Sequence, residues 1–260
     1  MAIPSIRWLR RRMVRERTME AIAEWQGFCP ICQAETTFRA YDVWLREHLT
    51  CTSCVGGSVP RERAIMLLLN RLHPHWPKLQ IHESSPAPRG MSIVLARDCS
   101  RYVPTQFFPS VPLGSMYRGV RCENLDAQTF PDDCFDIVIT QDVMEHVFHP
   151  DQVYREVFRT LRPGGLYLHT TPIDANAAAS IQRAELMADG TIRHLCPPEY
   201  HGNPIDDAGS LVTFQFGRDL PDLIASWTQF SVEIVHFNDR WHGLVAEFLD
   251  VLVCVKPPAS

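Results

Sequence analysis

The segment from Phe130 to Pro172 constrains the fold of this 260-residue chain more than any other. Residues 135–140 form a short, mostly apolar run rich in β-branched side chains, which is typical of a buried strand. Pro150 suits the first position of a helix, and apolar residues then recur at helical spacing as far as Leu161. A Pro-Gly-Gly sequence ends that helix, and residues 166–171 supply a second strand. The sequence therefore predicts a βαβ unit, which implies a parallel sheet with a right-handed crossover.

The same segment resembles a known family. The sequences F-P-D-D-C-F-D-I-V, D-V-M-E-H-V and R-T-L-R-P-G-G occur in this order before a strand that ends in T-T-P. This order is similar to the region after the fourth strand of class I S-adenosylmethionine-dependent methyltransferases of the "type 11" group. The resemblance implies an α/β fold, with a Rossmann-like seven-stranded sheet and helices on both faces. It also implies S-adenosyl-L-methionine (SAM) as the cofactor. The alternative is an ordinary α/β unit without this chemistry.

Two C-x-x-C pairs precede this region, Cys29 with Cys32 and Cys51 with Cys54. Two close thiolates from each turn can complete a tetrahedron around Zn²⁺, and the spacing between the pairs matches a small zinc ribbon. Four protein ligands leave no open position for chemistry, so we expect the zinc to be structural. Disulfides are the weaker alternative, because cytosolic thiols stay reduced. The other five cysteines lack ligand spacing and are expected to be small apolar fillers.

Composition fits a globular protein with an appended small module. Hydrophobic residues make up 45% of the chain and charged residues 21%, and no apolar run is long enough for a membrane helix. The basic N-terminus lacks an apolar core after its charges, so we expect a cytoplasmic protein. The predicted parts are a basic N-terminal helix or arm (1–26), a zinc ribbon (27–57), a linking helix (58–76) and a class I methyltransferase domain (77–257).

The first 17 residues are strongly basic, with six arginines against one glutamate, although the whole chain has a formal net charge of −5. One interpretation is a contact with nucleic acid or an anionic membrane. We favour a solvated or frayed helix, continuing as a polar helix over residues 18–27. The arginines are Arg7, Arg10, Arg11, Arg12, Arg15 and Arg17.

The resemblance assigns the cofactor contacts to residues that follow successive strands, where open α/β sheets form their crevice. After an expected first strand at 79–82, this class usually has an acidic residue and a glycine-rich loop. Here the sequence from Glu83 to Gly90 is E-S-S-P-A-P-R-G, which keeps the acidic residue but only one glycine. Its serines offer donors that suit a carboxylate. By the resemblance, the cofactor-binding residues are Glu83, Ser84, Ser85 and Gly90, then Gln106 for the ribose, Asn124 and Leu125 for the adenine, and Gln141 and Asp142 beside the methyl-donor pocket.

The remaining elements fit the same fold. Helices are predicted over 61–72, 91–98, 175–188 and 219–227, and strands over 101–105, 232–237 and 248–255. The last two strands resemble the antiparallel hairpin that closes methyltransferase sheets.

A polar, Pro-rich segment at 196–210 is long for a plain connection and is either a substrate lid or a surface excursion. Within it, His201 is predicted to be the catalytic residue, because an imidazole pKa of about 6.5 suits proton transfer at neutral pH. Glu145 and His146 are instead expected to form a structural pair.

The predicted function is transfer of the SAM methyl group to an unidentified acceptor, a small molecule or a glycan. This acceptor class follows from the acidic net charge and the polar 196–210 segment. One alternative is a zinc-ribbon RNA methyltransferase that uses the N-terminal arginines, which we do not favour. The other is a degenerate, non-catalytic methyltransferase fold that acts as a binding or scaffold protein, as the missing glycines would allow.

Overall fold

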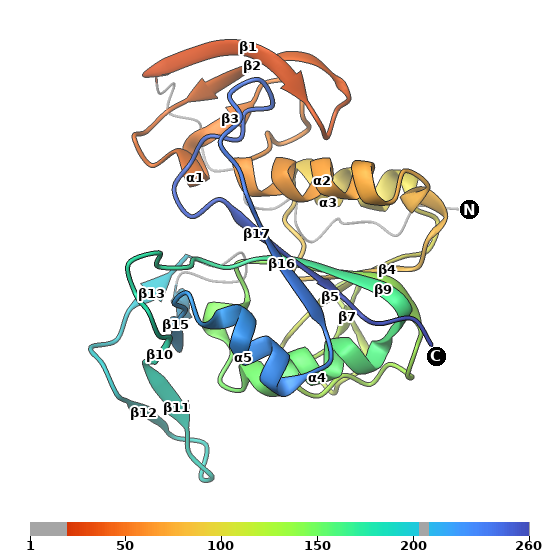
Figure 1. Cartoon of the computed structure of the whole chain (residues 1–260), viewed down its shortest axis with the longest axis vertical. Helices are drawn as coiled ribbons and strands as arrows, with labels where there is room; N and C mark the ends of the chain where they lie inside the picture. The colour runs from red at the N-terminus through yellow and green to blue at the C-terminus, as the bar shows by residue number, and fades with distance from the viewer. Residues whose placement is uncertain (1–19, 203–207, 260) are drawn as a thin grey trace.

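The structure is a computed structural model that describes residues 20–202 and 208–259 (Figure 1). The Arg-rich residues 1–17 lie outside the described residues, so the predictions made for them are not addressed by the fold. Within the described residues, no helix has both the length and the apolar character needed to cross a membrane.

An eight-stranded mixed sheet forms the centre of the molecule, with the strand order β16-β17-β9-β8-β4-β5-β7-β6. Strands β4, β5, β7, β8 and β9 are parallel to one another. Strand β17 is antiparallel to both β9 and β16, and β6 is antiparallel to β7. The predicted seven-stranded sheet is therefore present, and β6 adds a two-residue edge strand to it. The strands are β4 (Ile81–Ser84), β5 (Tyr102–Gln106), β6 (Met116–Tyr117), β7 (Val120–Cys122), β8 (Phe135–Gln141), β9 (Leu161–Thr170), β16 (Ser231–His236) and β17 (Asp250–Val255).

Helices cover both faces of this sheet, as predicted. Helices α2 (Pro60–Leu72) and α3 (Gly90–Asp98) lie on one face, and α4 (Pro150–Thr160) and α5 (Leu220–Trp227) lie on the other (Figure 1). The alternation of side chains along the strands explains the two layers. In β8, Ile137 and Ile139 belong to the core beneath α2 and α3, whereas Val138 belongs to the core beneath α4 and α5.

The predicted βαβ unit is present as β8, α4 and β9. Pro150 occupies the first turn of α4, and Val153 and Val157 are fully buried against the sheet. Strands β8 and β9 are adjacent and parallel, with Ile139 opposite Leu168. The local sequence pattern therefore fixes this part of the sheet.

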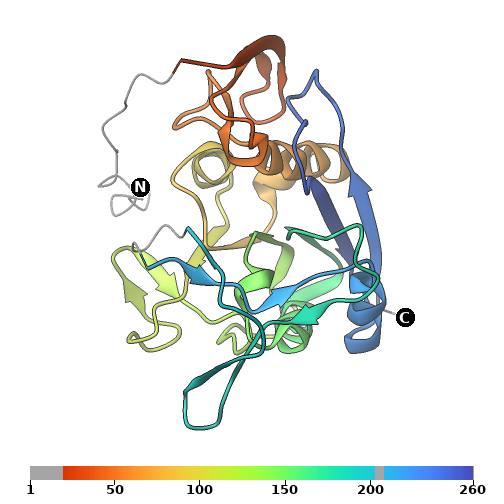
Figure 2. The same ribbon diagram turned by 90° about the vertical axis from the view of Figure 1, so that its left-hand side faces the viewer.

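The four-cysteine module is a three-stranded antiparallel sheet of β1 (Ala23–Cys29), β2 (Ala34–Ala40) and β3 (Leu49–Cys51), with the short helix α1 (Leu45–His48). It packs on the α2 side of the central sheet and shares one apolar core with it. The loop between β16 and β17 lies alongside the module (Figure 2). There the amide of Phe28 donates to the carbonyl of Trp241 at 2.8 Å. Distant parts of the chain thus hold the module in place.

Two predicted helices are absent from the described residues where they were expected. Residues 23–29 form β1 and not the end of a polar helix, because the chain reverses after Cys29 and β1 pairs with β2 along its whole length. Residues 175–188 contain turns and short strands. There the carboxylate of Asp174 accepts from the amide of Asn176 at 2.9 Å, a local bond that competes with helix formation.

Short antiparallel pairs replace the expected 175–188 helix and continue through the following segment. Strand β10 pairs with β15, β11 with β12, and β13 with β14. Pairing with strands farther along the chain therefore overrides the local helical pattern. These strands are β10 (Ile181–Gln182), β11 (Ala184–Leu186), β12 (Ile192–His194), β13 (Tyr200–His201), β14 (Ser210–Leu211) and β15 (Phe214–Gln215).

Candidate functional site

The carboxyl ends of the parallel strands β4, β5 and β8 meet at one edge of the sheet. In register, Ser84 at the end of β4 lies opposite Thr105 of β5 on one side and Thr140 of β8 on the other. Gln106 and Gln141 are the last residues of β5 and β8. The structure therefore brings residues from three predicted cofactor segments to one place, the position where open α/β sheets form their ligand crevice.

Glu83 connects these segments. Its carboxylate is buried and accepts hydrogen bonds from Ser92 Oγ at 2.8 Å, Tyr102 Oη at 2.5 Å and Gln141 Nε2 at 3.2 Å. Burial raises the pKa of Glu83 to about 7, against the opposing effect of the three hydrogen bonds. Glu83 thereby ties β4 to α3, β5 and β8 beneath the edge of the sheet.

Two amide side chains at this edge have unused hydrogen-bonding capacity. Gln106 is only 5% exposed, and its Oε1 is buried without a hydrogen-bond partner. The Oε1 of Gln141 is also buried and unpartnered, although its Nε2 donates to Glu83. Leaving a buried acceptor unpaired costs about 1–3 kcal/mol, so such atoms point to a missing donor. The hydroxyl and ammonium groups of SAM are donors of this kind, and the site fits that cofactor in this respect.

The loop after β4 uses its backbone donors within the protein. The Ser85 residue has a φ of +58°, and its amide donates to the carbonyl of Thr105 at 2.8 Å. The amide of Gly90, at the start of α3, donates to the carbonyl of Val55 at 3.1 Å. These two amides are therefore already hydrogen-bonded within the protein. The serine hydroxyls remain as the predicted donors to a ligand carboxylate.

The predicted adenine contacts follow β7. Asn124 is half-buried, and its carbonyl accepts from the amide of Ala127 at 3.1 Å. Leu125 is 5% exposed and packs in the core beneath α4 and α5, in the same cluster as Phe135 and Met144. Leu125 thus contributes to the core as well as to the region predicted for the purine.

Asp142 follows β8 in a left-handed conformation, with a φ of +51°. Its carboxylate accepts from Arg46 Nη2 at 2.6 Å and Thr170 Oγ1 at 2.8 Å, and lies 3.2 Å from Arg61 Nε. Burial acts to raise its pKa, but the guanidinium groups of Arg61 and Arg46 lower it to about 2. Sequence analysis did not identify these two arginines, because an ion pair between segments far apart in the chain produces no local pattern.

The predicted catalytic residue His201 lies beside the Glu145–His146 pair. Strand β13 carries His201, and the rings of His201 and His146 are 5.1 Å apart and nearly perpendicular. The β13–β14 region is attached to this pair by two hydrogen bonds, from the amide of Thr213 to the carbonyl of Glu145 at 2.8 Å and between His146 Nδ1 and the carbonyl of Leu211 at 2.9 Å. Sequence analysis did not place His201 next to these two residues.

The four cysteines of the predicted zinc ribbon converge. Their sulfur atoms all lie within 4.8 Å of one another, with Cys29 Sγ 3.6 Å from Cys54 Sγ and Cys32 Sγ 3.9 Å from Cys51 Sγ. A tetrahedral zinc–thiolate site with bonds of about 2.3 Å has sulfur–sulfur edges of about 3.8 Å. The cluster is therefore compatible with a structural zinc ion.

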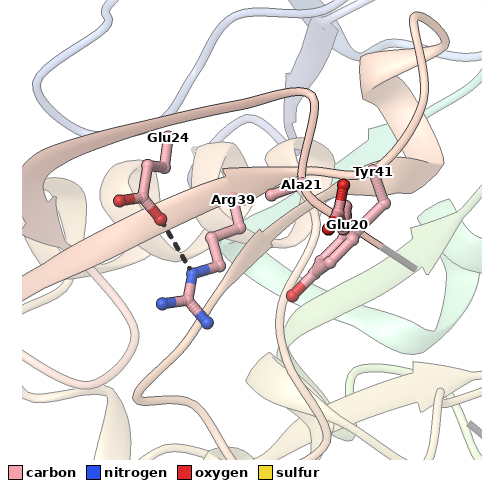
Figure 3. A pocket seen from close by; sticks show the side chains of 5 residues that line it. All are labelled: Glu20, Ala21, Glu24, Arg39 and Tyr41. Carbon is pink, nitrogen blue, oxygen red and sulfur yellow. Dashed lines mark hydrogen bonds and ion pairs between the residues drawn. The ribbon is translucent and has the colours of Figure 1, made fainter. Parts of the chain in front are cut away.

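An open pocket of about 360 Å³ lies elsewhere, on the four-cysteine module (Figure 3). Glu24 and Arg39 form an ion pair of 3.1 Å along its side, and both side chains are well exposed. It contains none of the predicted site residues, and we assign it no role. Its lining residues are Glu20, Ala21, Glu24, Arg39 and Tyr41.

The strand order, the parallel centre and the antiparallel β17 agree with the sheet that the resemblance to class I methyltransferases predicts. Comparison with known families agrees: residues 94–169, from α3 to β9, match the model of a methyltransferase domain.

One curated relative, from Mycolicibacterium smegmatis, carries the name of a probable S-adenosylmethionine-dependent methyltransferase. It is 42% identical over 53 residues, which are 20% of this chain and 21% of the relative. The chain thus spans about a fifth of the length of the curated relative that it matches.

Solved structures are similar at lower identity. An S-adenosylmethionine-dependent methyltransferase from Mesorhizobium loti has a TM-score of 0.45 at 15% identity, covering 74% of this chain and 97% of that chain. The YcgJ protein of Bacillus subtilis has a TM-score of 0.46 at 11% identity, covering 75% of this chain and 99% of that chain.

Proposed function

We propose that this chain is a SAM-dependent methyltransferase acting on a small-molecule or glycan acceptor. The observation that carries the proposal is the pair of buried, unpartnered amide oxygens of Gln106 and Gln141 at the carboxyl ends of β5 and β8. The methyltransferase-domain match over residues 94–169 supports the same function. When bound, SAM supplies an already activated sulfonium methyl group, so the protein mainly has to align cofactor and acceptor.

The chain's own residues take distinct parts in holding the cofactor. Gln106 accepts from the ribose hydroxyls, and Asn124 and Leu125 contact the adenine. Glu83 acts mainly through other residues, since its carboxylate fixes the amide of Gln141 and the hydroxyl of Ser92. The hydroxyls of Ser84 and Ser85, with the turn at Gly90, hold the amino-acid end. Asp142 fixes the loop beside the methyl donor through its two arginines.

Zinc has a structural part in this proposal. Cys29, Cys32, Cys51 and Cys54 bind one Zn²⁺ ion, which fixes the two turns of the module. The second turn contacts the cofactor loop directly, through the bond from Gly90 to Val55. Zinc therefore stabilises the loop as well as the module.

His201 is proposed to act on the acceptor. Its side chain is 40% exposed, and its Nε2 lies 3.5 Å from Glu199 Oε1. An exposed imidazole next to a carboxylate can take a proton from an acceptor hydroxyl, or from an amine that must lose one. The segment around His201 then serves as the acceptor side of the site. The cytoplasmic location of the protein stays a prediction.

Binding of S-adenosylhomocysteine to a matched pair of variants tests the cofactor site. Gln106→Met keeps the length of the side chain but removes the amide, and should weaken binding about fivefold to tenfold, as expected for one lost hydrogen bond. Gln182→Met, on the exposed strand β10, should bind as the wild type does. Equal affinity of the two variants would refute the assignment of Gln106.

A non-catalytic binding protein is the second candidate. The observation that favours it is the use of the Ser85 and Gly90 amides within the protein, which removes two donors from the glycine-poor loop. The two candidates differ in cofactor binding: the second predicts that neither variant nor wild type binds S-adenosylhomocysteine.

A further inference from the structure

A second group of side chains with metal-ligand chemistry lies outside the four-cysteine module. The ligand atoms of Glu145, His146 and His201 are all within 4.8 Å of one another. Two imidazoles and one carboxylate are a ligand set that suits divalent transition metals and leaves coordination positions open.

Glu145 presents an unpaired oxygen to this group. The side chain is 2% exposed, and its Oε2 accepts from Thr171 Oγ1 at 2.9 Å. Its Oε1 is buried without a hydrogen-bond partner and lies 3.9 Å from His146 Nε2. That distance is too long for a direct hydrogen bond, so Oε1 has no hydrogen-bond donor.

The hydrogen bond of His146 makes its other nitrogen available. His146 Nδ1 lies 2.9 Å from the carbonyl of Leu211, which can only accept, so Nδ1 carries the proton. In the neutral ring, Nε2 then has a free lone pair, and this is the nitrogen nearest Glu145 Oε1. Metal-binding histidines are commonly oriented by such a bond from the second nitrogen to a backbone carbonyl.

We propose that Glu145, His146 and His201 bind one divalent transition-metal ion on the acceptor side of the site. Metal–ligand bonds of about 2.1 Å allow two ligand atoms to lie up to about 4.2 Å apart, which accommodates Glu145 Oε1 and His146 Nε2 as they stand. His201 is partly exposed and completes the set by a small movement of its ring. In the structure His201 Nε2 lies 3.5 Å from the exposed carboxylate of Glu199, which would compete with the metal ion for the imidazole.

Neighbouring charges are consistent with this assignment. The carboxylate of Asp142, three residues before Glu145, is occupied by Arg46 and Arg61 and is therefore not available as a fourth ligand. A cation next to Glu145 would compensate a carboxylate that has no cationic partner of its own among the described residues, apart from His146.

The consequence for the reaction rests on the proposed function. An ion held by three side chains has open positions for an acceptor hydroxyl, and a bound divalent cation lowers the pKa of such a group. His201 would then be a ligand, and the cation would replace it in promoting loss of the hydroxyl proton, which would pass to solvent water. The preferred acceptor class becomes a hydroxyl compound.

Binding of Mn²⁺ tests the site without any methyl transfer. Mn²⁺ prefers nitrogen and oxygen ligands to thiolates, whereas Zn²⁺ binds four thiolates most tightly but also binds imidazole and carboxylate. The protein is therefore first given one equivalent of Zn²⁺ per chain, which fills the four-cysteine site and leaves no excess zinc to compete with Mn²⁺. Electron paramagnetic resonance then follows the loss of the free Mn²⁺ signal. We expect one Mn²⁺ per zinc-loaded chain, and affinity at least about tenfold lower for Glu145→Gln and for His201→Ala.

Two controls keep the result interpretable. His149→Ala alters an exposed imidazole outside the cluster and should bind Mn²⁺ as the wild type does. S-adenosylhomocysteine binding by His201→Ala reports on the cofactor site separately, so failure of the metal proposal is distinguishable from failure of the proposed function. The metal proposal is overturned if zinc-loaded wild type takes up no Mn²⁺, or if His201→Ala binds it equally well.

Discussion

Arg46 of the four-cysteine module donates a hydrogen bond to Asp142, with an Nη2–Oδ1 distance of 2.6 Å across 96 residues of sequence. The guanidinium is 3% exposed and also donates to the carbonyls of Glu247 and Phe248. Arg46 therefore joins the module, the β16–β17 loop and the end of β8. The loop next to the predicted methyl-donor pocket depends on the module for its position.

Asp142→Asn should lower the free energy of unfolding by about 3 kcal/mol, because it leaves Arg46 buried without an anionic partner and removes one of the two carboxylates that pair with Arg61. Denaturant unfolding measures the change. Asp151→Asn is the matched control, since Asp151 pairs with Arg155 on the exposed surface of α4 and should cost less than about 1 kcal/mol. Equal losses in the two variants would contradict the structural importance of the Asp142 pairs.

Gly90→Ala should destabilise the protein and weaken binding of S-adenosylhomocysteine. Gly90 has a φ of +47°, and an added Cβ would lie 2.2 Å from Glu62 Oε2 and 2.9 Å from Ser58 Cβ. We expect a loss of about 2–4 kcal/mol, from backbone strain and from displacement of the cofactor loop. Gly164→Ala separates these effects, because Gly164 also has a positive φ, +79°, but nothing within 4 Å of its added Cβ.

The control should lose only about 1–2 kcal/mol and should bind S-adenosylhomocysteine with wild-type affinity. Thermal unfolding and calorimetric titration give the two quantities. Wild-type ligand affinity in Gly90→Ala would show that the position of this loop does not matter for binding.

Cys51→Ser, or a chelator, should remove one zinc ion per chain and lower the unfolding temperature. The loss should also weaken cofactor binding, since the second cysteine turn holds the amide of Gly90 through Val55. Cys134→Ser is the matched control, because Cys134 is half-buried and lies outside the cluster. Metal analysis that finds equal zinc in both variants would contradict the four-cysteine assignment.

Glu83 should make the stability of the protein depend on pH. Its pKa is raised from 4.5 to about 7 in the folded state, so between these values the folded protein binds more protons than the unfolded chain. The stabilisation is fully present below pH 4.5 and is lost as the pH rises through 7, by up to about 3 kcal/mol. Glu83→Gln should show a smaller decline over this range in denaturant unfolding. If the stability of wild type and of Glu83→Gln declined in parallel with pH, burial of Glu83 would not be the cause of the decline.

The central βαβ unit was predictable because its information is local. The apolar run of β8, the proline at the start of α4 and the apolar spacing along that helix are all readable in one segment. The module strand β1 was missed because its partner β2 decides its conformation. The strands that replace the 175–188 helix likewise pair with residues farther along the chain.

The site was predictable to a smaller extent. Gln106 and Gln141 are the last residues of β5 and β8, and both of these strands are neighbours of β4 in the sheet. Arg46 reaches Asp142 only because the four-cysteine module packs against the central sheet. His201 comes next to Glu145 and His146 only through the β13–β14 pairing. Neither relationship has a signature in spacing or composition.

Calorimetric titration of the zinc-loaded chain with S-adenosylhomocysteine tests the central claim most directly. The account predicts one binding site per chain, with affinity reduced in Gln106→Met and retained in Gln182→Met. A titration that shows neither heat nor thermal stabilisation at millimolar ligand, with the chain folded and zinc bound, would contradict it.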